Sequence, residues 1–280
     1  MAGVRIVTDS ACDLLDETLT ELGIGLVPLR IRFGDEELLD RQELSTKEFW
    51  ARCASSPDLP STAAPSPGQF QAAFEEMADA GASGVVCINL SSKMSATIQS
   101  AHQAAETLAG RIPVRVVDSL TVTLGIGLVV TEAARAAESG AGLDEVVEAA
   151  ERAVGRLKLY GAIDTLENLK KGGRIGGAQA LLGSMLSIKP VIEVRDGVVE
   201  QESKQRTRSR SLQYLADKVR AAGPVSRLAV FSADAPDLDE FLRLLEGITP
   251  TDGATLFGDV GPVIGSHAGR GAIGVAWIPA

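Results

Sequence analysis

The stretch Val4-Arg5-Ile6-Val7-Thr8-Asp9-Ser10 joins a short β-branched run to a turn of hydroxyl and acidic side chains. The same pattern returns at 85–95, where VVCINL precedes SSKMS, and at 114–119, which is VRVVDS. Between these two later runs, apolar residues recur at helical spacing at Ile98, Ala101, Ala105 and Leu108. Strands that alternate with amphipathic helices are typical of βαβ units around a mostly parallel sheet. The first half of the chain therefore predicts an α/β domain.

The pattern changes close to residue 156, after a helix that the apolar residues of 143–154 predict. A strand is predicted at 157–163. Alternating runs on both sides of Arg195-Asp196-Gly197 predict a hairpin, because Asp-Gly favours a tight turn between antiparallel strands. The other elements of a second unit are predicted at 212–219, 228–231, 238–245 and 273–277. We therefore expect two α/β domains, residues 1–156 with a mostly parallel sheet and residues 157–280 with a mixed one.

The composition excludes one class of protein and favours another. A chain of 280 residues can bury a large core without disulfides or a structural metal. The formal net charge of −10, from 27 Lys and Arg against 37 Asp and Glu, opposes nucleic-acid binding, which needs an extended basic surface. Apolar residues make up 45% of the chain but aromatic ones only 4%, so the interior must be mainly aliphatic. Such an interior suits a pocket lined with aliphatic groups.

The location of the protein is predicted from its first residues and its cysteines. The start, MAGVRIVTDS, lacks the apolar core of a signal peptide, and no run is long and apolar enough to span a membrane. The cysteines, Cys12, Cys53 and Cys87, are odd in number and far apart, which favours reduced thiols over a disulfide framework. We expect a soluble cytoplasmic protein. Transient contact with a membrane surface stays open.

Hydroxyl and acidic side chains follow each of the first three predicted strands. Parallel strands end at one edge of a sheet, where α/β proteins bind ligands. Helix capping is the simpler explanation for several serines, and the pairs that fit capping boxes are Ser10 with Asp13, Ser45 with Glu48, and Ser66 with Gln69. The turn 91–95 differs, because it offers three hydroxyls where one cap needs only one. A helix N-terminus there would favour a bound carboxylate or phosphate.

The segment 55–68, SSPDLPSTAAPSPG, is the other candidate for binding. Its prolines argue against regular structure, and it is longer than a simple connection needs. Long loops beside a sheet edge are often binding loops. Thr62 is the best-placed donor in this segment, although a hydroxyl that only stabilises a turn explains it equally well.

Several segments, taken together, resemble the DegV family; they are 7–10 (VTDS), 62–68 (TAAPSPG), 90–97 (LSSKMSAT), 171–174 (KGGR) and 262–269 (PVIGSHAG). They follow the family's order and spacing over essentially the whole chain. The resemblance implies a two-domain α/β fold that binds a long-chain fatty acid, such as palmitate or oleate, between its domains. It also implies a carrier rather than an enzyme. A separate fatty acid kinase, similar to dihydroxyacetone kinase, would phosphorylate the presented carboxylate for phospholipid synthesis.

The resemblance carries over to particular residues of this sequence. It assigns the carboxylate-binding hydroxyls to Thr62 and Ser95, with the backbone N–H of Ala96 as a further donor. The family motif of His267 lies near the carboxylate, and Ser92 is a further candidate there. Arg174 lies in a basic loop of an acidic protein and is the candidate for contact with the kinase, and Arg206, after Lys204, is a second candidate. The structural alternatives are a loop hydrogen bond for His267 and a solvated, mobile basic turn for Arg174. Two departures from the family pattern are Ala63-Ala64, where the family usually has Ser-Gln, and Ala96, where it usually has Gly.

Two other classes of function compete with the carrier, an enzyme and a scaffold. An ATP- or phosphate-dependent enzyme could use Asp9 and Asp118 at the sheet edge, but the sequence has no phosphate-binding P-loop. Residues 172–177, GGRIGG, follow a helical pattern rather than a strand, so they are no dinucleotide fingerprint. The histidines, His102 and His267, lack spaced partners, so we predict neither a metal site nor a cofactor. The second rival is a scaffold that binds no ligand.

Overall fold

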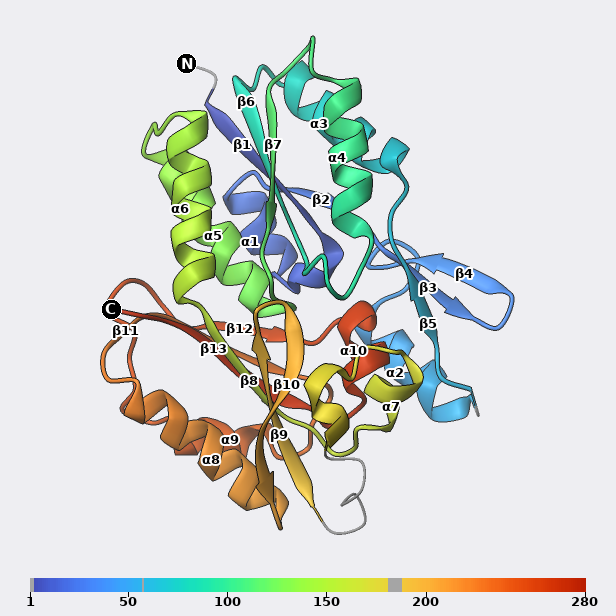
Figure 1. The fold of residues 1–280 in the computed structure, drawn as a ribbon, viewed down its shortest axis with the longest axis vertical. Helices are drawn as coiled ribbons and strands as arrows, with labels where there is room; N and C mark the ends of the chain where they lie inside the picture. Colours follow the sequence, from blue (N-terminus) through green and yellow to red (C-terminus); the bar gives the residue numbers. More distant parts are fainter. Residues whose placement is uncertain (1–2, 57, 181–187) are drawn as a thin grey trace.

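Four short apolar runs of the N-terminal half form one parallel sheet. The computed structural model, which describes residues 3–56, 58–180 and 188–280, orders them β2-β1-β6-β7 (Figure 1). Their bounds are Val4–Asp9 (β1), Gly25–Val27 (β2), Gly84–Asn89 (β6) and Val114–Asp118 (β7). Every residue of β6 is buried, because helices cover both faces of the sheet. The predicted parallel sheet of the N-terminal domain is confirmed.

Helices cover the two faces of this sheet in pairs. α3 (Pro67–Asp79) packs beside α4 (Thr97–Thr107), and α5 (Leu124–Glu138) beside α6 (Leu143–Arg156) on the other side (Figure 1). The amphipathic spacing predicted α4 and α6. It did not predict α5. Residues 124–131 of this helix are all buried, because α5 packs against β1 on one side and against strands of the C-terminal sheet on the other. A helix that is apolar all round has no periodicity to detect.

Two of the three predicted capping interactions are confirmed. Ser45 accepts the N–H of Glu48 at the start of α2 (Thr46–Ser55), and Ser66 forms a capping box with Gln69 at the start of α3. The predicted capping box of Ser10 with Asp13 is wrong. Ser10 instead accepts the N–H of Leu29 at 3.1 Å, and the short 3₁₀ turn η1 (Ser10–Cys12) is capped by the carboxylate before it. The chain then turns into α1 (Asp16–Glu21).

A small antiparallel sheet lies beside the parallel one. It consists of β3 (Arg30–Phe33), β4 (Glu36–Leu39) and β5 (Ser61–Ala63) in the order β4-β3-β5. The expectation that 55–68 lacks regular structure is therefore wrong at its centre. Thr62 pairs with Ile31 of β3, and the prolines at positions 60 and 65 flank the strand without interrupting it. This pairing fixes the backbone of the Thr62 segment.

The C-terminal half forms a six-stranded sheet in the order β10-β9-β8-β13-β11-β12. Its strands are β8 (Lys158–Ala162), β9 (Lys189–Arg195), β10 (Val198–Gln205), β11 (Val225–Ser232), β12 (Leu256–Asp259) and β13 (Ile273–Pro279). All neighbours are antiparallel except β11 and β12, so the predicted mixed sheet is confirmed. The predicted hairpin joins β9 to β10, with positive φ at Asp196 and Gly197.

The two faces of the second sheet have different neighbours. α8 (Arg208–Ala221) and α9 (Leu238–Leu244) cover one face, and the N-terminal domain lies toward the other (Figure 1). Two short helices, α7 (Glu167–Lys171) and α10 (Pro262–Ala268), lie at the junction, where α10 contacts α7 as well as α2, β3 and β5. Within the described ranges, no helix combines the length and apolar character needed to cross a bilayer. The exact boundary at residue 156 stays a prediction.

Candidate functional site

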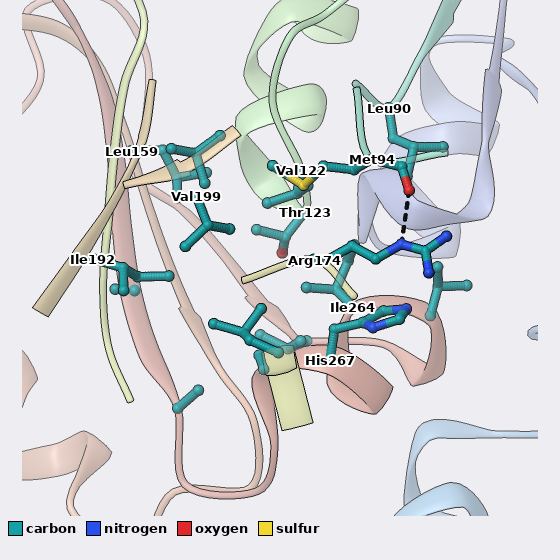
Figure 2. Close-up of a pocket in the computed structure, with 18 of the residues that line it drawn as sticks. Leu90, Met94, Val122, Thr123, Leu159, Arg174, Ile192, Val199, Ile264 and His267 are labelled. Carbon is teal, nitrogen blue, oxygen red and sulfur yellow. Dashed lines mark hydrogen bonds between the residues drawn. The ribbon is translucent and has the colours of Figure 1, made fainter. Parts of the chain in front are cut away.

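An apolar cavity lies between the N-terminal domain and the six-stranded sheet of the C-terminal domain. Its volume is about 200 Å³. Aliphatic side chains from both domains form most of its wall, among them Leu29, Leu90, Val122, Leu159, Ile163, Ile192, Val194, Val199, Val260 and Val263 (Figure 2). The predicted aliphatic pocket thus has a counterpart in the structure. Burial of an apolar ligand against such a wall is favourable by about 25 cal/mol for each Å² removed from water.

Polar groups gather at one end of this cavity from segments that are far apart in sequence. Thr62 comes from β5, Ser95 and Ala96 from the turn before α4, and His267 from α10, and all four line the cavity. The packing of α10 against β5 places His267 beside Thr62. The structure therefore brings together four of the residues that the sequence singled out.

Thr62 and His267 are joined directly. The distance between Thr62 Oγ1 and His267 Nε2 is 3.0 Å, whereas His267 Nδ1 has no partner among the described residues. Burial, helped by the nearby Arg174 charge, lowers the pKa of His267 to about 4, so the imidazole is neutral at pH 7. Because a buried N–H without an acceptor is rarer than a bare acceptor, we assign the hydrogen to Nε2. Thr62 then keeps its own hydroxyl hydrogen to donate into the cavity.

A glycine makes room for the His267 ring. A Cβ at Gly172, just after α7, would lie 2.3 Å from His267 Nδ1, which is far inside van der Waals contact. Only a residue without a side chain lets the backbone of this turn approach the imidazole so closely. Gly172 of the segment 171–174 thus has a structural function beside the ring, in addition to its place in the turn.

Ser95 has a similar hydrogen-bonding environment. Its Oγ accepts the N–H of Thr97 at 3.3 Å and lies 2.8 Å from Thr97 Oγ1. When the Thr97 hydroxyl donates to it, Ser95 has its own hydrogen free for a ligand, as Thr62 does. Ala96 has φ −81° and ψ 4°, a conformation that needs no glycine, so the departure from the family pattern at this position is accommodated. Among the described residues, no hydrogen bond uses the Ala96 N–H, which precedes the positive end of α4.

Two backbone carbonyls hold the Arg174 side chain at the mouth of the cavity. Its Nε donates to the carbonyl of Met94 at 3.0 Å (Figure 2), and its Nη1 donates to that of Gly172 at 2.5 Å. Arg174 also lines a second, more polar cavity of about 480 Å³, which shares Thr62 and His267 with the first. The guanidinium therefore lies between the apolar cavity and the solvent side.

Two other candidates lie outside this group. Ser92 lines neither cavity, and its N–H donates to Asp118 at 3.1 Å. Arg206 is exposed between β10 and α8 and also lines neither cavity. Any function of Arg206 toward a partner would therefore be separate from the site at Thr62.

The acidic residues of the strand ends have structural partners. Asp9 is fully buried and accepts the backbone N–H groups of Ala11 and Leu90 and the side chain of Asn89. Burial raises its pKa to about 6. Asp118 accepts the N–H groups of Ser92 and Leu120. Neither carboxylate lines the apolar cavity, and the described ranges contain no cluster of three His, Cys, Asp or Glu that could hold a metal.

From the sequence we expect the C-terminal domain, residues 157–280, to close the acyl-chain pocket, but the sequence singled out none of the strand residues that form this wall. Leu159, Gly161 and Ile163 alternate along β8 with Tyr160 and Ala162, and the first three line the cavity. The alternation was available as a signal that β8 has two different faces. It gave no indication that the facing domain leaves space there.

Comparisons with known proteins agree with this geometry. The chain matches the family described as "Uncharacterised protein, DegV family" over residues 3–280. It is 37% identical over 276 residues to a DegV domain-containing protein of Streptomyces coelicolor, covering 97% of each chain. It is also similar to the solved structure of a fatty acid binding DegV family protein from Thermus thermophilus, at 32% identity and a TM-score of 0.90, covering 99% of this chain and 100% of that one. DegV of Bacillus subtilis, a fatty acid binding protein, is 28% identical with a TM-score of 0.86, and both chains are covered completely. Because the family match spans residues 3–280 and the relative from Streptomyces coelicolor is 37% identical over 97% of this chain, the chain belongs to the DegV family.

Proposed function

We propose that this protein binds one long-chain fatty acid in the cavity between its domains, and presents its carboxylate to a separate fatty acid kinase. The observation that carries the proposal is the combination of an aliphatic cavity with the hydroxyl groups of Thr62 and Ser95, which line it together with Ala96. The fatty acid binding of the relatives from Thermus thermophilus and Bacillus subtilis supports the choice of ligand.

The carboxylate would be held by Thr62, Ser95 and the N–H of Ala96. Each of the two hydroxyl oxygens has a neighbouring group able to donate to it, namely His267 Nε2 for Thr62 and Thr97 for Ser95. Both hydroxyl hydrogens are then directed to the ligand. The N-terminus of α4 adds a positive dipole, so an ionised carboxylate can leave water without a buried lysine.

The acyl tail would supply most of the affinity. Burying about fourteen methylenes at roughly 0.8 kcal/mol each gives about 11 kcal/mol, which several kcal/mol of association cost offset. The polar contacts add less to the affinity, but they fix which end of the ligand lies at Thr62. A kinase that approaches from the side of Arg174 would meet the carboxylate and not the methyl end.

Recombinant protein is expected to retain one host fatty acid per chain through aqueous purification, because the enclosed apolar cavity disfavours release into water. Native mass spectrometry before and after mild organic extraction would show the loss of one ligand mass, and gas chromatography would identify it. Protein that arrives without lipid and takes up neither palmitate nor oleate would favour the ligand-free scaffold instead.

Arg174→Ala is expected to slow acyl phosphate formation by a cognate kinase with ATP much more than it lowers palmitate affinity. The guanidinium lines both cavities and is bonded only to carbonyl oxygens among the described residues, so its charge is available to an incoming phosphoryl group. Arg206→Ala is the second arm of the test. Because Arg206 lines neither cavity, its effect on transfer should be smaller. Loss of palmitate binding in Arg174→Ala would place Arg174 in the binding site and not in the transfer step.

A further inference from the structure

A row of four cross-strand neighbours on the second sheet faces the cavity. Ile192 of β9 is opposite Gly161 of β8, Gly161 is opposite Gly274 of β13, and Gly274 is opposite Phe231 of β11. All four residues line the cavity. The row thus has a large side chain at each end and none on the two central strands.

The two glycines of this row are not equivalent. A Cβ at Gly274 would lie 2.0 Å from Cε2 of Phe231, so the aromatic ring already occupies the space above that glycine. A Cβ at Gly161 would find Ile192 Cγ1 at 3.6 Å and the carbonyl of Ile273 at 3.8 Å, which are ordinary contacts. The protein itself therefore has room for a methyl group at Gly161.

This room belongs to the cavity. A glycine within a strand makes the folded protein less stable than an alanine there would, because glycine loses more backbone entropy on folding and packs no side chain. Figure 2 shows Ile192, the strand neighbour of Gly161, across the cavity from His267 and Arg174. The space above Gly161 thus lies at the end of the cavity away from the hydroxyl donors.

Building on the proposed function, we infer that Gly161 receives the end of the acyl tail and so sets the longest fatty acid that the site accepts. Phe231 closes the adjacent position above Gly274 and directs the tail toward Gly161. The selected property is chain length, because the hydroxyl donors fix the carboxylate at the opposite end. A methyl group at Gly161 would then remove space that only the longer acids use.

The test measures the affinities of myristate, palmitate and stearate for extracted protein by displacement of a fluorescent fatty acid. In Gly161→Ala, the affinity for stearate relative to myristate should fall by about tenfold or more, the scale of one misfitted methylene in an apolar pocket. Myristate affinity should stay within about twofold of wild type. Phe231→Leu should change the ratio in the opposite direction, because the shorter side chain uncovers the space above Gly274.

The control variant is Gly155→Ala in α6, where an added Cβ meets nothing within 4 Å. It should leave all three affinities unchanged. An unchanged stearate-to-myristate ratio in Gly161→Ala, or an equal loss for all three acids, would overturn the assignment of Gly161 while the fatty acid proposal stands. Wild-type protein that binds none of the three acids would overturn both. The Phe231→Leu ratio decides the matter if Gly161→Ala does not fold.

Discussion

Palmitate is expected to bind about ten- to hundredfold more weakly to Thr62→Ala and to Ser95→Ala than to the wild-type protein. Each variant removes a hydroxyl donor from a carboxylate that the cavity takes out of water, and hydrogen bonds to charged groups contribute about 1.5–3 kcal/mol. Thr62→Ala should also lower the free energy of unfolding, because it leaves His267 Nε2 without its only partner among the described residues. Isothermal titration of extracted protein with palmitate measures the affinities, and urea unfolding measures the stability.

Two controls separate this hydrogen-bonding effect from general damage. Thr62→Ser keeps the hydroxyl and should keep most of the affinity. Methyl palmitate lacks the charge, so wild type should bind it more weakly than palmitate, and the alanine variants should discriminate less between the two. If both alanine variants bind palmitate as wild type does, the carboxylate lies elsewhere in the cavity.

Local chemistry gave usable signals for part of the structure around the cavity. The hydroxyl-rich turn before α4 could be found because three serines at a helix start exceed what capping needs. The strand-end pattern likewise predicted the parallel sheet, since buried parallel strands are short apolar runs followed by turns. Both inferences use interactions between residues that are close in sequence.

The sequence could not predict the parts that depend on distant packing. The Pro-rich segment around Thr62 is a strand only because β3 supplies a partner, and that pairing spans about thirty residues. The contact of Thr62 with His267 joins the two domains across 205 positions. The anchoring of Arg174 on the Met94 carbonyl also depends on how the domains meet. A local pattern carries no information about such contacts.

A second set of buried groups near the domain junction predicts how stability depends on pH. Asp13 and Asp40 line a separate cavity beside Gly261, the residue before α10. Both carboxylate oxygens of Asp40, and Oδ2 of Asp13, have no hydrogen-bond partner among the described residues. Burial raises the pKa of Asp40 to about 6 and that of Asp13 well above its ordinary value, although the Ser10 hydroxyl beside Asp40, the Thr123 hydroxyl beside Asp13 and the nearby Arg41 charge oppose these shifts. The folded protein is therefore most stable when these two carboxyls are protonated.

The free energy of unfolding of Asp40→Asn, taken relative to that of wild type, is expected to increase by about 2 kcal/mol when the pH rises from 4.5 to 7.5. The pKa of Asp40 is higher in the folded state than in the unfolded state, so its stabilising contribution is present at low pH and is lost as the pH rises through about 6. The amide cannot ionise and does not lose that contribution. Urea unfolding of both proteins at the two pH values gives the difference.

The control variant is Thr46→Ala, because Thr46 lines the same cavity but has no titrating group. This variant should change the free energy of unfolding equally at both pH values. A difference between Asp40→Asn and wild type that does not vary with pH would mean that Asp40 is hydrated or paired in solution, and that the junction beside α10 holds a charged carboxylate instead of a neutral acid.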